Sequence, residues 1–137
     1  MKRKAQCHCG NLAVLCEGEP EHVVMCHCEL CQRRTGTAFN LAAWFPASAV
    51  EIEGDEKTYT RVGDLGIDTT FHFCPNCGSN VYWRTSVPDM IGVAVGCFAD
   101  PEFRAPSVSI YDSQRHSWLI APEGIPTFEG NGEEESE

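Results

Sequence analysis

The chain has 137 residues, nine cysteines and a formal net charge of −10 at pH 7, a length that fits one domain with its own hydrophobic core. Only ten lysines and arginines face twenty acidic residues, which argues against the basic surface that nucleic-acid binding requires, so we expect no nucleic-acid partner. The longest apolar run, Met90–Ala99, is about half the length of a membrane-spanning helix, so we expect no membrane segment. With no signal-peptide core near the start, the sequence predicts a cytoplasmic protein.

Short segments rich in β-branched and aromatic residues predict a series of strands. In chain order they are Leu12–Gly18, His22–Cys28, Phe39–Phe45, Val50–Gly54, Lys57–Val62, Asp68–Cys74, Asn80–Thr85 and Met90–Cys97. Glu29–Thr37 predicts a short helical turn that Gly36 ends. Val108–Tyr111 and His116–Ala121 follow as final strands or extended segments, and we expect their apolar residues, Trp118 included, to lie in the core.

These elements predict an all-β, mainly antiparallel fold with short helical turns. We expect a single zinc-binding β domain over residues 1–128. Residues 129–137 carry five acids and no base, a composition that predicts a disordered acidic tail.

The spacing of the cysteines indicates metal binding rather than disulfides. Three motifs account for seven of the nine: C-x-C at Cys7 and Cys9, C-x-C-x-x-C from Cys26 through Cys28 to Cys31, and C-x-x-C at Cys74 and Cys77. In the reducing cytosol such clusters are typical of zinc sites. Cys16 and Cys97 lie outside the motifs.

The first and last motifs predict one structural zinc site. In CPNCG, Pro75 favours a turn and Gly78 accepts the backbone angles that follow the second ligand. Cys7 and Cys9 would share one face of an extended strand. Since each pair needs two more ligands, the simplest arrangement is one closed site of Cys7, Cys9, Cys74 and Cys77.

The central motif is one ligand short of a tetrahedron. On a strand, Cys26 and Cys28 share a face and His27 points to the other, which makes His27 a poor ligand. A turn then returns Cys31 to the metal. The fourth ligand could be Cys97, Cys16, His72 or an exogenous group; a protein ligand would make the site structural, whereas an exchangeable position is typical of catalysis.

Three ordered motifs carry a family resemblance: Cys-x-Cys-Gly near the start, Cys-His-Cys-x-x-Cys followed by Arg and Gly, and Phe-x-Phe-Cys-x-x-Cys-Gly-Ser. They resemble the glutathione-dependent formaldehyde-activating enzyme family, which includes the centromere-protein-V-like proteins. The resemblance covers roughly Gln6 to Phe128 and implies a β-tent zinc fold with two zinc ions per chain. It also implies that Cys7, Cys9, Cys74 and Cys77 hold a structural zinc, and that Cys26, Cys28 and Cys31 hold a catalytic one.

The resemblance further implies a carbon-sulfur lyase that adds the sulfur of glutathione, or a similar thiol, to formaldehyde or a related small carbonyl. A zinc with three thiolates is a good host for a further thiolate. Glu29 and His72 are candidates for proton transfer, and Arg33 and Arg34 are candidates for binding a substrate carboxylate or for balancing the thiolate charge. Two alternatives remain: a non-catalytic zinc scaffold or interaction module, and a thiol redox enzyme that uses Cys97.

Overall fold

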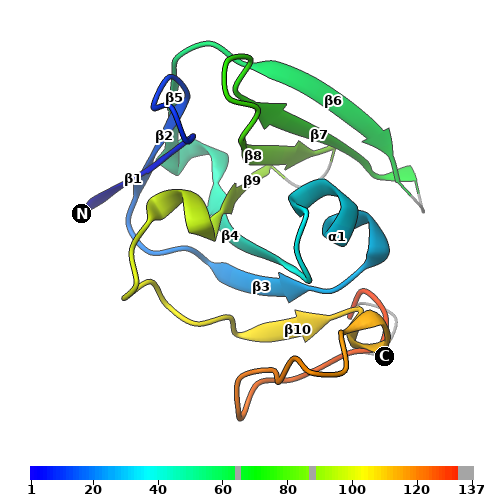
Figure 1. Cartoon of the computed structure of the whole chain (residues 1–137). Helices are drawn as coiled ribbons and strands as arrows, with labels where there is room; N and C mark the ends of the chain where they lie inside the picture. The colour runs from blue at the N-terminus through cyan, green and yellow to red at the C-terminus, as the bar shows by residue number, and fades with distance from the viewer. Residues whose placement is uncertain (64–65, 87–88, 133–137) are drawn as a thin grey trace. The chain divides into compact units, whose positions relative to one another are not determined.

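The structure, a computed structural model, describes residues 1–63, 66–86 and 89–132. Most of the regular structure is strand, with one α-helix and short 3-10 helices among the described residues, so the predicted all-β class is confirmed. Figure 1 labels the elements. They are β1 (Lys2–Gln6), β2 (Ala13–Glu17), β3 (His22–Cys26), α1 (Glu29–Thr35), β4 (Asn40–Pro46), η1 (Ala47–Ala49), β5 (Val50–Glu53), β6 (Lys57–Val62), β7 (Asp68–Phe73), β8 (Asn80–Thr85), β9 (Met90–Ala94), η3 (Val95–Phe98), β10 (Val108–Ile110) and η4 (Asp112–Gln114).

The chain folds into two compact units. The first contains Met1–Glu21 and Ala43–Phe103, and the second contains His22–Ala42 and Arg104–Glu137. Strand β4 begins in the second unit and continues into the first. The first unit therefore holds the outer cysteine motifs, and the second unit holds the central motif.

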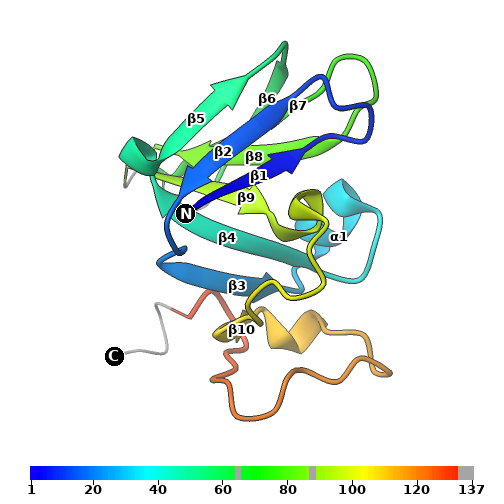
Figure 2. The same ribbon diagram turned by 90° about the vertical axis from the view of Figure 1, so that its left-hand side faces the viewer.

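Antiparallel pairing builds the first unit. Strand β2 lies between β1 and β5 (Figure 2), while β6, β7, β8 and β9 pair in chain order. Strand β1 was not predicted, because its KRKAQ sequence lacks the β-branched and aromatic residues that indicate strands; it forms by pairing with Ala13–Glu17. The core of the first unit includes the buried residues Ala5, Leu12, Val14, Phe45, Val81, Tyr82, Trp83, Ile91 and Val93.

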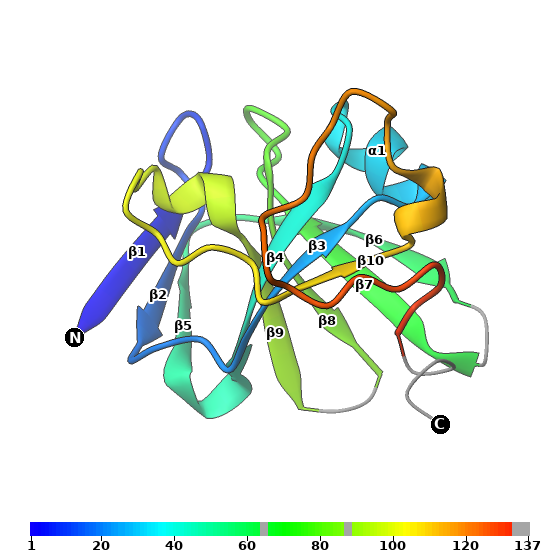
Figure 3. The same cartoon turned by 90° about the horizontal axis from the view of Figure 1, so that it is seen from below.

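Strand β10 holds the second unit together. It pairs with β3 in parallel, which the long connection between them permits, whereas the pairs described above for the first unit are antiparallel. On its other side runs the C-terminal segment (Figure 3): the Ser109 N–H donates to the Pro126 carbonyl (3.0 Å), and the Phe128 N–H donates to the Ser109 carbonyl (2.9 Å). The segment thus acts as a further strand-like partner.

Two predictions about the end of the chain are wrong in detail. The predicted strand Met90–Cys97 ends at Ala94, where η3 begins. His116–Ala121 forms no strand, because it starts with a turn in which the Leu119 N–H donates to the His116 carbonyl. Trp118 is 68% exposed and therefore not a core residue.

The segment predicted to be a disordered tail, residues 129–137, begins within a hydrogen-bonded part of the structure. The Ser113 hydroxyl donates to the Glu129 carbonyl (3.1 Å), and the Tyr111 N–H donates to the Gly130 carbonyl (2.7 Å). Residues 133–137 lie outside the described residues. Among those that are described, no helix has the length and apolar character needed to cross a membrane.

Candidate metal centres

The four sulfurs of Cys7, Cys9, Cys74 and Cys77 lie within 4.8 Å of one another. Cys7 and Cys9 are 3.7 Å apart at sulfur, and Cys9 and Cys74 are 3.6 Å apart. A tetrahedral zinc with sulfur bonds of about 2.3 Å sets its sulfurs about 3.8 Å apart, whereas a disulfide would bring them to about 2.05 Å. The donor set therefore fits a tetrahedral metal such as zinc.

Two turns position these sulfurs. Cys7 and Cys9 lie in a turn after β1, where the Gly10 N–H donates to the Cys7 carbonyl, and not on the extended strand that we expected. The turn after β7 begins at Cys74, whose carbonyl accepts from the Gly78 N–H at 2.9 Å. Gly78 has a φ of 80°, the left-handed conformation anticipated from the CPNCG sequence.

Hydrogen bonds to sulfur favour the thiolate form at the exposed ligands. The Ser79 side chain and N–H, together with the Cys9 backbone, lower the pKa of Cys77 to about 5. The Asn76 side chain and the Asn11 backbone lower the pKa of Cys9. Because metals bind thiolates rather than thiols, these contacts prepare the site for a cation.

The two cysteines outside the motifs also belong to the first unit. Burial, together with the charges of Cys7 and Cys77, raises the pKa of Cys97 to about 11, and its thiol lies 3.9 Å from the Asn80 carbonyl. Cys16 is fully buried on β2, and this burial raises its pKa to about 12 although Arg3 opposes the shift. Both thiols stay protonated at neutral pH.

The central sulfurs form a second cluster, in which those of Cys26, Cys28 and Cys31 also lie within 4.8 Å of one another. Cys26 ends β3, and Cys28 is the N-cap of α1 with an extended backbone (φ −62°, ψ 151°). The Cys31 N–H donates to the Cys28 sulfur at 3.3 Å, so one turn of helix brings the third sulfur back. Cys26 and Cys31 are buried and Cys28 is half-buried.

Crowding of the three sulfurs opposes their ionisation. Hydrogen bonding with Cys28 and Cys31, followed by burial, raises the pKa of Cys26. For Cys31, hydrogen bonding with Cys26 lowers the pKa, but hydrogen bonding with Cys28, burial and the charge of Cys28 outweigh it, and the net shift is upward. Three thiolates this close therefore need a cation beside them, which a metal ion supplies.

His27 points away from the central cluster, as the strand alternation predicted. The ring is fully buried, its Nε2 lies 2.9 Å from the Ser109 hydroxyl, and it packs 6.0 Å from the Phe39 ring. Burial lowers the pKa of His27. The residue between Cys26 and Cys28 thus anchors their loop to β10.

The charged candidates on α1 divide into two roles. Glu29 pairs with Arg33 one turn later on the exposed face of the helix, where such a pair contributes only about 0.3 to 0.5 kcal/mol. Arg34 is less exposed, and its charge lowers the pKa of Cys31. Of the two arginines, Arg34 is the one whose charge acts on the central cluster.

His72 belongs to a different constellation, in the first unit. Its Nδ1 lies 3.1 Å from Glu56 Oε2, and its ring stacks 4.2 Å from the Tyr82 ring. The Tyr82 hydroxyl donates to the same Glu56 oxygen at 2.5 Å. Sequence reasoning missed Glu56, because a glutamate in a turn between strands carries no signal of a buried partner.

The central cluster contains three sulfurs, all from the second unit. Among the described residues of that unit, no further cysteine, histidine or carboxylate places a ligand atom within the same 4.8 Å. The three protein candidates for a fourth ligand, Cys16, His72 and Cys97, all belong to the first unit.

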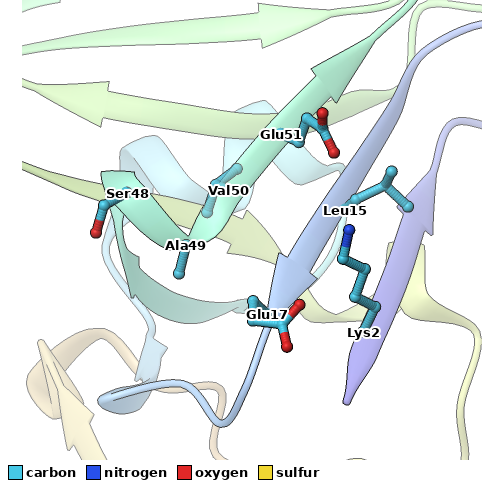
Figure 4. A pocket seen from close by; sticks show the side chains of 7 residues that line it. All are labelled: Lys2, Leu15, Glu17, Ser48, Ala49, Val50 and Glu51. Atoms are coloured by element: carbon cyan, nitrogen blue, oxygen red, sulfur yellow. The ribbon is translucent and has the colours of Figure 1, made fainter.

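The first unit also has a shallow hollow of about 380 Å³ on its three-stranded sheet (Figure 4). The hollow is lined by Lys2, Leu15, Glu17 and Ser48–Glu51. Its lining contains neither a thiol nor an imidazole.

Comparisons with known proteins agree with the motifs. A family model described as glutathione-dependent formaldehyde-activating enzyme matches residues 2–114. A crystal structure of a protein from Rhodobacter sphaeroides superposes with a TM-score of 0.56 at 22% identity, covering 90% of this chain and 98% of that one, and shows the same fold. No curated protein matches the chain. The family match extends over most of the sequence, and the chain belongs to the glutathione-dependent formaldehyde-activating enzyme family.

Proposed function

We propose that the protein is a zinc-dependent carbon-sulfur lyase that joins a glutathione-like thiol to formaldehyde or a related small carbonyl. In the forward direction the thiol sulfur bonds to the carbonyl carbon, the carbon–oxygen π bond opens, and the proton lost by the thiol ends on the oxygen. The product with formaldehyde is a hemithioacetal that carries an S-hydroxymethyl group. Family membership and the three-sulfur cluster, which lacks a fourth ligand from the described part of its unit, support this proposal.

The proposal assigns different roles to the two clusters, with one zinc in each. Cys7, Cys9, Cys74 and Cys77 would hold a structural ion, since four sulfurs complete a tetrahedron. Cys26, Cys28 and Cys31 would hold the catalytic ion. When bound there, zinc supplies a soft, exchangeable position that favours the thiolate form of an incoming thiol.

The chain's own residues define how a thiol could approach. Cys28 is half-buried whereas Cys26 and Cys31 are buried, so the Cys28 side of the cluster is the accessible one. Arg34 offsets thiolate charge at Cys31. Arg33 lies on the exposed face of α1 and could exchange its pairing with Glu29 for a substrate carboxylate.

Two groups remain candidates for the proton transfer. Glu29 follows the ligand Cys28 directly, and release from Arg33 would free its carboxylate. His72 has a carboxylate beside Nδ1, the arrangement that orients an imidazole so that Nε2 exchanges protons. A cytoplasmic location and the β-tent topology belong to the same proposal, since both come from the sequence and its family resemblance.

The direct test is catalysed exchange between formaldehyde, glutathione and their adduct. These species interconvert without an enzyme, so we would follow the exchange rate at equilibrium by NMR with ¹³C-labelled formaldehyde. The zinc-loaded protein should accelerate the exchange, Cys28→Ser should abolish the acceleration, and Cys97→Ser should retain it. A wild-type protein that holds two zinc ions yet leaves the exchange rate unchanged would favour the non-catalytic scaffold.

A further inference from the structure

Gln32, which follows the ligand Cys31 on α1, connects three parts of the second unit. Its side-chain amide N–H group donates to the His27 carbonyl at 2.8 Å and lies 3.2 Å from the Gln114 carbonyl. Its Oε1 lies 3.0 Å from Nε2 of His116. One side chain thus joins the ligand loop, the helix and the segment that follows β10.

These contacts define the orientation of the amide and the tautomer of His116. Both His27 and Gln114 present carbonyl oxygens, which only accept, so the amide nitrogen must face them. The amide oxygen then faces His116, whose Nε2 must carry a proton in order to donate. Every polar atom of the Gln32 side chain is therefore used.

Gln114 adds a second connection between the same segments. Its Oε1 accepts from the Glu29 N–H at 2.7 Å, at the first turn of α1. Such N–H groups have no partner within the helix itself. Gln114 and His116 therefore hold the helix that carries Cys31 at both its start and its second turn.

Backbone groups of α1 already contact Cys28, since the Cys31 N–H donates to the Cys28 sulfur at 3.3 Å and the Gln32 N–H donates to the Cys28 carbonyl at 3.0 Å. The Gln32 side chain adds a contact to the residue before Cys28, His27. Cys28 lies in the loop after β3 and Cys31 lies in the helix, while Gln32 bonds to the carbonyl of His27 in that loop. We propose that Gln32, held by Gln114 and His116, is a positioning residue that sets the geometry of the central metal site. This inference rests on the proposed metal at the cluster, and it involves His116, which lies beyond the family match at residues 2–114.

The sharpest test compares two changes of the same kind. Gln32→Glu replaces the amide donor by an oxygen that repels the His27 and Gln114 carbonyls. Gln114→Glu adds the same charge close by, yet keeps an oxygen to accept from the Glu29 N–H. The probe is Co²⁺ alone, bound to the metal-free full chain, with the affinity of each site measured by competition with a chelator and its spectrum recorded.

We expect Gln32→Glu to weaken Co²⁺ binding at the central site about 10- to 100-fold, the usual effect of losing a ligand's supporting contact. It should also shift the ligand-field bands of the loaded central site, and leave the outer site unchanged. Gln114→Glu should leave both affinities near those of the wild type. A purely structural role would leave the spectrum of the loaded site unaltered, so equal spectra and affinities in the two variants would overturn the inference.

If Gln32→Glu does not fold, a second pair of variants tests the positioning role of Gln32. His116→Ala removes the donor to Gln32, whereas His22→Ala removes an exposed histidine at the start of β3. His116→Ala should weaken central Co²⁺ binding about 2- to 12-fold, the range expected from one hydrogen bond, and His22→Ala should not. If the two variants bind Co²⁺ equally well at the central site, the positioning role of Gln32 is overturned, whereas the proposed catalytic metal is not. A wild-type chain that binds one Co²⁺, at the outer site, overturns both this inference and the proposed catalytic metal.

Discussion

The sulfur of Cys9 lies 3.6 Å from the sulfur of Cys74, although 65 positions separate the two residues in the chain. A metal at this place joins the turn after β1 to the turn after β7. Closing so long a loop restricts the unfolded chain, and the energy of metal binding adds directly to the stability of the fold. The outer cluster should therefore be needed for folding.

We expect Cys74→Ser to give protein that is unfolded, insoluble or greatly reduced in melting temperature, with the outer zinc lost. Zinc content and thermal melting are the measurements. Cys97→Ser is the matched control, because Cys97 lies outside both clusters; it should keep two zinc ions per chain. Unchanged melting in Cys74→Ser would rule out a structural metal there.

The exposure of Trp118 predicts that this side chain contributes little to stability. Trp118→Ala should change the free energy of unfolding by less than about 0.5 kcal/mol, as is usual for surface positions. Trp83→Ala makes the same change in the core, where Trp83 is 4% exposed and packs against Trp44 and Phe71; we expect a loss of about 3 to 5 kcal/mol. Chemical denaturation measures both, and a large loss for Trp118→Ala would contradict its surface position.

The two cysteine clusters that could hold a metal ion were predicted from the sequence because their spacing is a local property. A C-x-x-C turn or an N-capped helical turn places two sulfurs together whatever the rest of the chain does. Most strands could be predicted for a similar reason, since β-branched and aromatic residues mark them. The pairing of the two outer motifs in one site was predicted from their spacing, since each pair needs two more ligands, and the family resemblance implied the same pairing.

Features that depend on distant partners could not be predicted. His27 and Ser109, like Gln32 and Gln114, are 82 positions apart, and neither pair carries a local signal. Strand β1 is polar, and only its pairing with β2 makes it a strand. Trp118 is an error of the opposite kind. It was predicted to lie in the core because it is apolar, but it lies in a turn without a strand partner and is exposed.

Shortening the chain should distinguish the acidic residues from the segment that pairs with β10. Deletion of 133–137 should leave stability and zinc content unchanged, because EEESE contains no apolar residue to bury. Deletion of 126–137 removes the partners of Ser109, Tyr111 and Asp112. It should lower the melting temperature and weaken metal binding at the central cluster. Equal stability of the two truncations would show that the segment beside β10 contributes nothing.

The buried thiol of Cys16 predicts a loss of stability at high pH. Burial raises its pKa from 9.0 to about 12, so the folded state keeps a proton that the unfolded state releases. Stability from this group is fully present below about pH 9 and declines as the pH rises from 9 towards 12, by at most about 1.4 kcal/mol per pH unit. Cys16→Ala should flatten this part of the pH profile of unfolding. An unchanged slope in the variant would contradict the shift.

The measurement that tests the central claim most directly is a titration of the Co²⁺-loaded protein with glutathione. If the central cluster offers an exchangeable position, the added sulfur should strengthen the thiolate-to-metal absorption. Cys28→Ser should abolish this response while keeping the outer site, and Cys97→Ser should leave it unchanged. Four sulfurs at the central metal before any thiol is added, falling to three in Cys97→Ser, would contradict the account and make the central metal structural.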